Sequence, residues 1–121
     1  MKWQFDNDRP IYTQLIEQIE QWVLSGEYPP GSRLPGVREL AADAAVNPNT
    51  MQRALAELET AGLLSTQSTN GRFVTEDKQY IEKLRGDQAL SVTRDYVKKM
   101  SDLGCPPKDI SALLADELKN K

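Results

Sequence analysis

The sequence predicts a mainly α-helical fold with one small β-hairpin. Apolar residues recur every three or four positions in several segments, which is the spacing of amphipathic helices. A polar corner, Asn47-Pro48, separates two of these segments, and it is a helix-start signal because Asn caps helices and Pro suits their first turn. Farther along the chain, Asn70-Gly71 lies between two short strand-like runs and is a strong hairpin signal.

The first predicted helix runs from Pro10 to Leu24 and ends before Gly26. Its apolar face is expected to pack in the core, and it consists of Ile11, Leu15, Ile19, Trp22 and Val23. Trp3 and Phe5 precede this helix and are expected to cover an edge of the core or of a partner subunit.

Two shorter helices follow. The segment Val37–Ala44 begins after Gly36, an acceptable but weak N-cap. The next helix is predicted over residues 48–61, capped by Asn47 and stopped by Gly62 in a left-handed conformation. Its buried stripe consists of Met51, Ala54, Leu55 and Leu58. Helix, corner, helix and hairpin in this order form a winged helix-turn-helix, whose second helix fits the major groove of DNA.

The face opposite that stripe carries Asn49, Gln52 and Arg53. Amide groups read adenine and guanidinium groups read guanine through paired hydrogen bonds, so these side chains are candidates for reading bases. An ordinary solvated helix face has a similar composition. The preceding helix, the Asn-Pro corner and the hairpin favour the DNA-reading interpretation.

The hairpin, or wing, is predicted to comprise strands at Leu63–Gln67 and Arg72–Thr75 with a turn at Ser68–Gly71. Arg72 lies beside the tip, where it could reach a phosphate or a narrow minor groove. Exposed arginines are common on surface hairpins, and only the place of this one after a helix-turn-helix makes it a candidate.

Several motifs in this region occur together. They are Pro10-Ile-Tyr-x-Gln-Leu15, Leu34-Pro-x-x-Arg-Glu-Leu-Ala41, Asn47-Pro-Asn-Thr50, Arg53-Ala-Leu55, Leu58-Glu-x-x-Gly-Leu63 and Gly71-x-Phe-Val74. With them, residues 10–75 resemble the DNA-binding domain of the GntR family of bacterial transcription regulators, and most of all its short YtrA-like subfamily.

The resemblance implies roles for three further residues. Arg38 would contact DNA, Thr50 would touch a phosphate, and Gly71 at the wing tip would approach the minor groove. Three features depart from the usual pattern. Many family members have Ser at the position of Gly36 and Arg at that of Gln52, and the wing usually has a second Gly or a basic residue before its tip, where this chain has Ser68-Thr69. These departures bear on base preference and on nonspecific affinity.

The remaining chain is predicted to form two amphipathic helices, Asp77–Leu103 and Ile110–Leu118, separated by Gly104-Cys105-Pro106-Pro107. We therefore expect a DNA-binding domain at residues 1–76 and a helical dimerisation region at residues 77–121. Apolar stripes that a small domain cannot cover predict self-association, and the resemblance implies a homodimer as well. Any small-molecule effector is expected at these C-terminal helices or at the dimer interface.

Composition narrows the class of protein. The 121 residues include no His and one Cys, so we expect no catalytic site, no metal site and no cofactor. No apolar run is long enough to span a membrane. Cys105 cannot form an internal disulfide, which fits a cytoplasmic protein, and a redox role for it is the less favoured interpretation.

Charge is unusual for a DNA-binding domain, because residues 1–76 hold ten Asp or Glu against six Lys or Arg. Four of those six basic residues are arginines within residues 33–72, where DNA contact is expected. An acidic remainder is expected to reduce binding to random DNA.

Taken together, these features predict a cytoplasmic bacterial transcription regulator, not an enzyme. We expect it to act as a repressor that binds an inverted-repeat operator in double-stranded DNA as a homodimer. The alternative is a winged helix that serves as a protein-interaction module without reading DNA.

Overall fold

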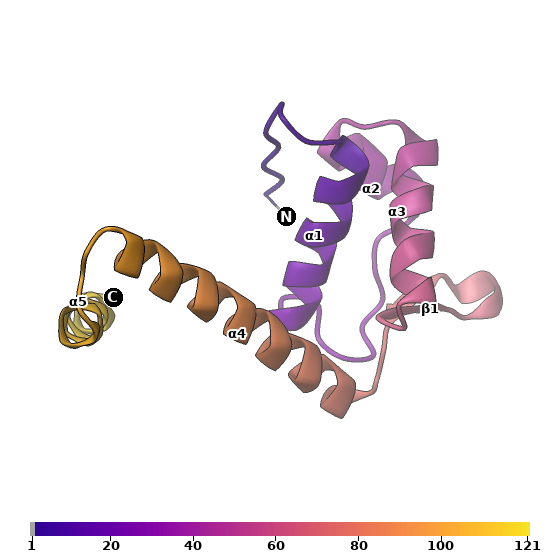
Figure 1. The fold of residues 1–121 in the computed structure, drawn as a ribbon. Helices are drawn as coiled ribbons and strands as arrows, with labels where there is room; N and C mark the ends of the chain where they lie inside the picture. The colour runs from indigo at the N-terminus through magenta and orange to yellow at the C-terminus, as the bar shows by residue number, and fades with distance from the viewer. Residues whose placement is uncertain (1) are drawn as a thin grey trace. The chain divides into compact units, whose positions relative to one another are not determined.

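The computed structural model describes residues 2–121 (Figure 1). The chain divides into two compact units, one ending at Glu82 and one beginning at Lys83. The boundary falls inside the long helix α4, Lys78–Asp102.

The first unit contains three helices and a hairpin, in the order of a winged helix-turn-helix. The elements are α1 (Ile11–Leu24), α2 (Val37–Ala44), α3 (Pro48–Thr60), β1 (Leu64–Thr66), the single 3-10 turn η1 (Ser68–Asn70) and β2 (Arg72–Val74). Helix α3 packs against both α1 and α2, and the hairpin follows its C-terminal end (Figure 1). The best-buried apolar residues come from all of these packed elements, and they include Leu15, Ile19, Leu40, Met51, Leu55, Leu58, Leu63 and Val74. The predicted fold class is confirmed.

The signals at the helix ends act as expected. The side chain of Asn47 accepts a hydrogen bond of 2.7 Å from the backbone N–H of Asn49, and Pro48 opens α3. Gly36 is the N-cap of α2. Gly62 follows α3 with φ of +86°, in the left-handed region that favours glycine.

A third backbone segment pairs with the two strands of the wing, and the sequence did not predict it. Strands β1 and β2 pair antiparallel, with Thr66 opposite Arg72. On the other edge of β2, the backbone N–H of Leu34 donates to the carbonyl of Arg72 at 2.9 Å, and Arg33 pairs with Phe73. Residues 31–34 therefore tie the wing to the segment that leads into α2. The strands are shorter than predicted, and the 3-10 turn η1 lies at the predicted turn, Ser68–Gly71.

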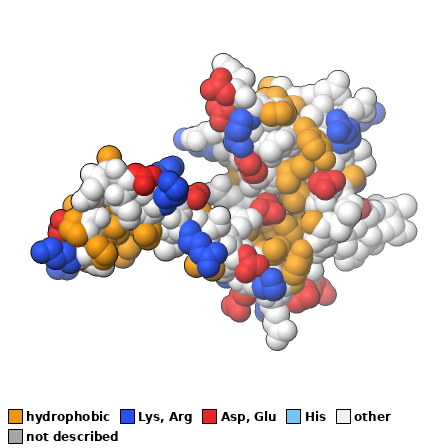
Figure 2. Space-filling model, in the orientation of Figure 1, with side chains coloured by type: hydrophobic (Ala, Val, Ile, Leu, Met, Phe, Trp, Pro, Cys, Tyr) orange, Lys and Arg blue, Asp and Glu red, His pale blue; other side chains and the backbone are white. Residues whose placement is uncertain are grey.

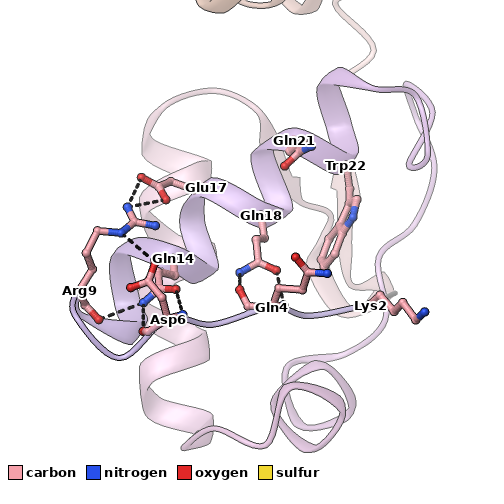
Figure 3. Close-up of a pocket in the computed structure, with 9 residues that line it drawn as sticks. All are labelled: Lys2, Gln4, Asp6, Arg9, Gln14, Glu17, Gln18, Gln21 and Trp22. Carbon is pink, nitrogen blue, oxygen red and sulfur yellow. Dashed lines mark hydrogen bonds and ion pairs between the residues drawn. The ribbon is translucent and has the colours of Figure 1, made fainter. Parts of the chain in front are cut away.

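Two glutamines of α1 hold the N-terminal segment (Figure 3). The Gln14 side chain, 1% exposed, accepts from the backbone N–H of Asp6 and donates to the carbonyls of Asp6 and Arg9, each at 2.9 Å. Gln18 makes a similar reciprocal pair with the backbone of Gln4. These side-chain amides give the backbone of the N-terminal segment the hydrogen-bond partners that a neighbouring strand would otherwise supply. They line a polar pocket of about 420 Å³.

The aromatic residues of the N-terminal segment lie as the sequence suggested, against an edge of the first unit. The Trp3 ring stacks on Phe5 and meets Trp22 edge-on, with centroids 4.6 Å apart in the second pair. The Trp3 indole also donates to Asp43 of α2 at 3.0 Å. Ile11, in contrast, was predicted to be in the core and is 37% exposed, because it sits at the first position of α1.

The start of α4 belongs to the first unit. The Tyr80 hydroxyl donates to the carbonyl of Ala61, and Ile81 is 3% exposed. Asp77 caps this helix by accepting from the backbone N–H of Tyr80 at 3.1 Å.

The second unit consists of the rest of α4 and α5 (Pro107–Lys119). Gly104, with φ of +90°, ends α4, close to the predicted break. Ile110 is buried, but many large apolar side chains lie on the surface (Figure 2). They are Leu90, Val92, Val97, Leu103, Leu113, Leu114 and Leu118.

Candidate nucleic-acid interface

The outward face of α3 carries the predicted base-reading residues. Asn49, Gln52 and Arg53 are exposed, and Thr50 is half-buried. The opposite face of the helix, including Met51 and the residues at helical spacing from it, is buried in the core. Because the core fixes the helix, its outward side chains are presented from a rigid element.

Arg53 stacks on an aromatic ring of the neighbouring helix. Its guanidinium carbon lies 4.5 Å from the centroid of the Tyr12 ring in α1. This is a cation–π contact, which holds a cation over the face of the ring. Tyr12 belongs to the motif Pro10-Ile-Tyr-x-Gln-Leu15, but nothing in the sequence indicates that it meets Arg53.

Arg72 lies against α3. Its Nε lies 2.5 Å from a Glu59 carboxylate oxygen that also accepts a hydrogen bond from the Thr66 hydroxyl. Its Nη1 donates to the side-chain oxygen of Gln52 at 3.4 Å. The side chains of Arg72 and Glu59 are only 16% and 29% exposed. The wing is thus joined to the recognition helix through a predicted base-reading residue.

The same contacts lower the pKa of Glu59. Burial of the carboxyl group raises its pKa, but the hydrogen bonds from Thr66 and Arg72, together with the positive charge of Arg72, outweigh burial. Glu59 is therefore held in its charged form, as the partner of Arg72.

Gly71 and Arg33 meet at the base of the wing tip. Gly71 has φ of +104°, and a Cβ added there would lie 3.0 Å from Nε of Arg33. A shallow hollow of about 210 Å³ lies between the wing and the start of α2, with Arg33, Gly36 and Gly71 in its lining. Arg33 is one of the four arginines within residues 33–72 but is not among the site residues predicted from the sequence.

Three arginines of the first unit stand without an acidic partner. Within residues 2–121, Arg33, Arg38 and Arg53 form no ion pair, and all three are exposed. The structure thus links Gln52 to Arg72, Arg53 to Tyr12 and Gly71 to Arg33. For the side chains of Arg38 on α2 and Asn49 on α3, the described part of the chain shows no comparable side-chain contact.

Within the described part of the chain, no group of three or more acidic, Cys or His residues could hold a metal ion. None of the helices described is long and apolar enough to cross a membrane.

Comparison with known proteins decides the family. The sequence profile of the bacterial regulatory proteins of the gntR family matches residues 11–74, which is more than half of the chain. The chain belongs to the GntR family. This confirms the prediction that the chain is a transcription regulator with a winged helix-turn-helix. It also confirms the prediction that the chain is not an enzyme, because the relatives in this family are transcription regulators.

Two relatives from Bacillus subtilis (strain 168) are similar in sequence. The HTH-type transcriptional regulator YhcF is 36% identical over 107 residues, which cover 88% of each chain. The HTH-type transcriptional repressor YtrA is 43% identical over 68 residues, which cover 56% of this chain and 52% of YtrA. The second match spans about half of each protein, whereas the first spans most of both.

Solved structures extend the comparison. A GntR family transcriptional regulator from Listeria monocytogenes superimposes with a TM-score of 0.85 at 40% identity, covering 93% of this chain and 98% of that one. The DNA-binding domain of AraR in complex with operator ORX1 superimposes with a TM-score of 0.57 at 28% identity, covering 62% of this chain and 96% of that one.

Proposed function

We propose that this chain is a repressor that binds an inverted-repeat operator as a homodimer and blocks a promoter. The observation that carries the proposal is the outward face of α3, where Asn49, Gln52 and Arg53 are exposed on a helix fixed by the core. Amide and guanidinium groups on such a helix suit the edges of bases in the major groove. The AraR domain bound to its operator has a similar fold, which supports the same mode of action. Because an operator lies in chromosomal DNA, the chain would act in the bacterial cytoplasm.

The predicted site residues would divide the work. Asn49, Gln52 and Arg53 would read bases, and Thr50 would contact a phosphate. Arg38 would touch DNA from α2, where it is exposed and forms no ion pair within residues 2–121. The wing, with Gly71 and Arg72, would lie beside the minor groove.

Residues 77–121 would form the dimer interface, next to a DNA-binding domain at residues 1–76. The support is the set of exposed apolar side chains on α4 and α5, since a two-fold dimer would bury them and would match two half-sites. An effector, where one exists, would bind at these helices or across the interface.

The test is a binding series by fluorescence anisotropy. An operator is first selected from random DNA by the full chain, and binding is then compared for Arg38→Ala, Arg53→Ala and Arg72→Ala on the operator and on a scrambled duplex. Arg94→Ala, an exposed arginine of α4, controls for loss of charge. We expect weaker operator binding by the Arg38 and Arg53 variants at least. Unchanged affinity in all three would reject DNA reading and favour the protein-interaction alternative.

A further inference from the structure

Two arginines stand close to the wing tip, and they differ in their partners. Arg72 is 16% exposed, pairs with Glu59 and contacts Gln52. Arg33 is exposed, forms no ion pair within residues 2–121, and its guanidinium packs against Gly71. Arg33, unlike Arg72, therefore has a positive charge that no carboxylate of the described residues neutralises.

The backbone pairing explains why they differ. Arg33 pairs directly with Phe73, and residues paired in this way place their side chains on the same face of a sheet. Arg72 precedes Phe73, so its side chain lies on the opposite face, which is the face of Thr66 and Glu59. The register that turns Arg72 toward α3 thus turns Arg33 away from Glu59.

We propose that Arg33 supplies the phosphate contact of the wing, and that Arg72 with Glu59 is a positioning pair that fixes the side chain of Gln52. This inference rests on the proposed DNA-binding function, and it refines the role of Arg72 given above. It also adds a residue, Arg33, that the family motifs quoted above do not contain.

Electrostatics favours this assignment. A phosphate placed on Arg72 would also meet the carboxylate of Glu59, which its hydrogen bonds keep charged, and two anions repel each other. Arg33 carries no such penalty. An unpaired surface cation that neutralises a phosphate releases a counterion, and so it contributes to the salt dependence of binding.

The pair of Arg72 and Glu59 also restricts the side chain of Gln52. A free glutamine side chain has many rotamers and would lose this freedom on binding a base. Here the Arg72 guanidinium, itself fixed by Glu59, donates to the Gln52 oxygen at 3.4 Å. This contact restricts the orientations of the amide before DNA arrives, which is how a neighbouring group preorganises a reading residue.

The experiment separates charge from positioning. Anisotropy of a labelled mixed-sequence duplex is measured over a NaCl series for the full-length wild type, Arg33→Gln, Arg33→Lys, Arg72→Gln, Arg72→Lys and the control Arg94→Gln. Thermal unfolding followed by circular dichroism shows which variants remain folded. In parallel, each protein selects bound sequences from random DNA.

We expect Arg33→Gln to reduce the slope of log affinity against log salt by about 0.9 per protomer, and Arg33→Lys to retain it. Arg72→Gln and Arg72→Lys should keep the wild-type slope but change the selected bases at one or two positions. The inference is overturned if Arg33→Gln keeps the slope, if Arg72→Gln reduces it as much, or if both Arg72 variants select the wild-type sequence. A wild type that binds no DNA would instead reject the proposed function.

Discussion

At the scale of single residues, the recognition helix depends on contacts that prepare its side chains. Arg53 is held by Tyr12 and Gln52 by Arg72, and neither partner lies on the outward face of α3. An arginine that is already stacked loses less side-chain freedom when it meets a base. The sequence-specific part of binding should therefore be sensitive to residues that touch no DNA.

We predict that Arg53→Ala weakens operator binding by about 1 to 3 kcal/mol per half-site and relaxes preference at one or two base pairs. Tyr12→Ala should produce part of the same effect, whereas Tyr12→Phe should stay near wild type because the ring face is kept. A double-mutant cycle by anisotropy should give a coupling of about 0.5 to 1 kcal/mol between the two residues. Strict additivity of Arg53→Ala and Tyr12→Ala would show that the stacking does not matter for binding.

The pairing of Glu59 predicts that the stability of the folded chain depends on pH. Its pKa in the folded chain lies below the usual value of 4.5, so its pairing stabilises the folded state above the pKa of the unfolded chain. That stability is lost as the pH falls through the lowered pKa of the folded state. Urea unfolding of wild type and Glu59→Gln should differ most near neutral pH and converge in acid. The prediction fails if the difference between them is the same at both ends of the pH range.

At the scale of elements, the turn between α2 and α3 contains a strained residue. Ala45 ends α2 in the left-handed conformation, with φ of 59° and ψ of 44°, and its side chain is exposed. This conformation costs an L-residue roughly 1 to 2 kcal/mol, and glycine avoids most of that cost. We expect Ala45→Gly to raise the free energy of unfolding by about 0.5 to 1 kcal/mol, measured by urea denaturation. Ala42→Gly, in the exposed interior of α2, is the matched control and should destabilise the chain by a similar amount.

The elements themselves were largely predictable, because their signals are local. Asn47-Pro48 marks the start of α3, Gly62 marks its end, and apolar spacing identifies its buried face. These depend on residues a few positions apart, where capping and periodicity act. The bounds of the first four helices therefore agree with the structure to within one residue, whereas α5 begins at Pro107, three residues before the predicted start at Ile110.

The contacts that complete the site were not predictable in this way. The strand-like segment at residues 31–34 has no hydrophobic alternation, and its pairing with β2 arises from the fold. The contacts of Arg72 with Gln52 and of Arg53 with Tyr12 join residues 20 and 41 positions apart. Gln14, at 1% exposure, looks like any polar helix residue until the N-terminal segment is placed beside it. Each of these is a consequence of tertiary packing.

At the scale of the whole molecule, the distribution of charge matters more than its sum. The net charge is −3, which by itself does not suit DNA. Yet three exposed arginines of the first unit, Arg33, Arg38 and Arg53, form no ion pair within residues 2–121, and they lie in the helix-turn-helix or the segment before it. Acidic groups elsewhere on the chain would repel DNA of any sequence. The few unpaired arginines would then suffice for binding only at sequences where contacts to bases add to their attraction for phosphates.

The division into two units also sets how the dimer should be tested. A chain cut after Thr75 would lose Tyr80 and Ile81, which contact or are buried in the first unit. A cut after Glu82 keeps them. We predict that residues 1–82 fold, sediment as a monomer, and bind a selected operator roughly 100-fold or more weakly than the full chain, because two linked domains engage the second half-site at high effective concentration.

A point variant of the full chain provides the control for truncation. Leu114 is 46% exposed, so Leu114→Glu should leave the fold of one protomer intact while placing a charge in the apolar surface of α5. We expect this variant to sediment with a reduced dimer fraction and to bind the operator more weakly, whereas Lys119→Glu, at the end of the same helix, should stay a dimer. A truncated chain that still sediments as a dimer would place the interface within the first unit. In that case the exposed leucines of α5 would need a different partner.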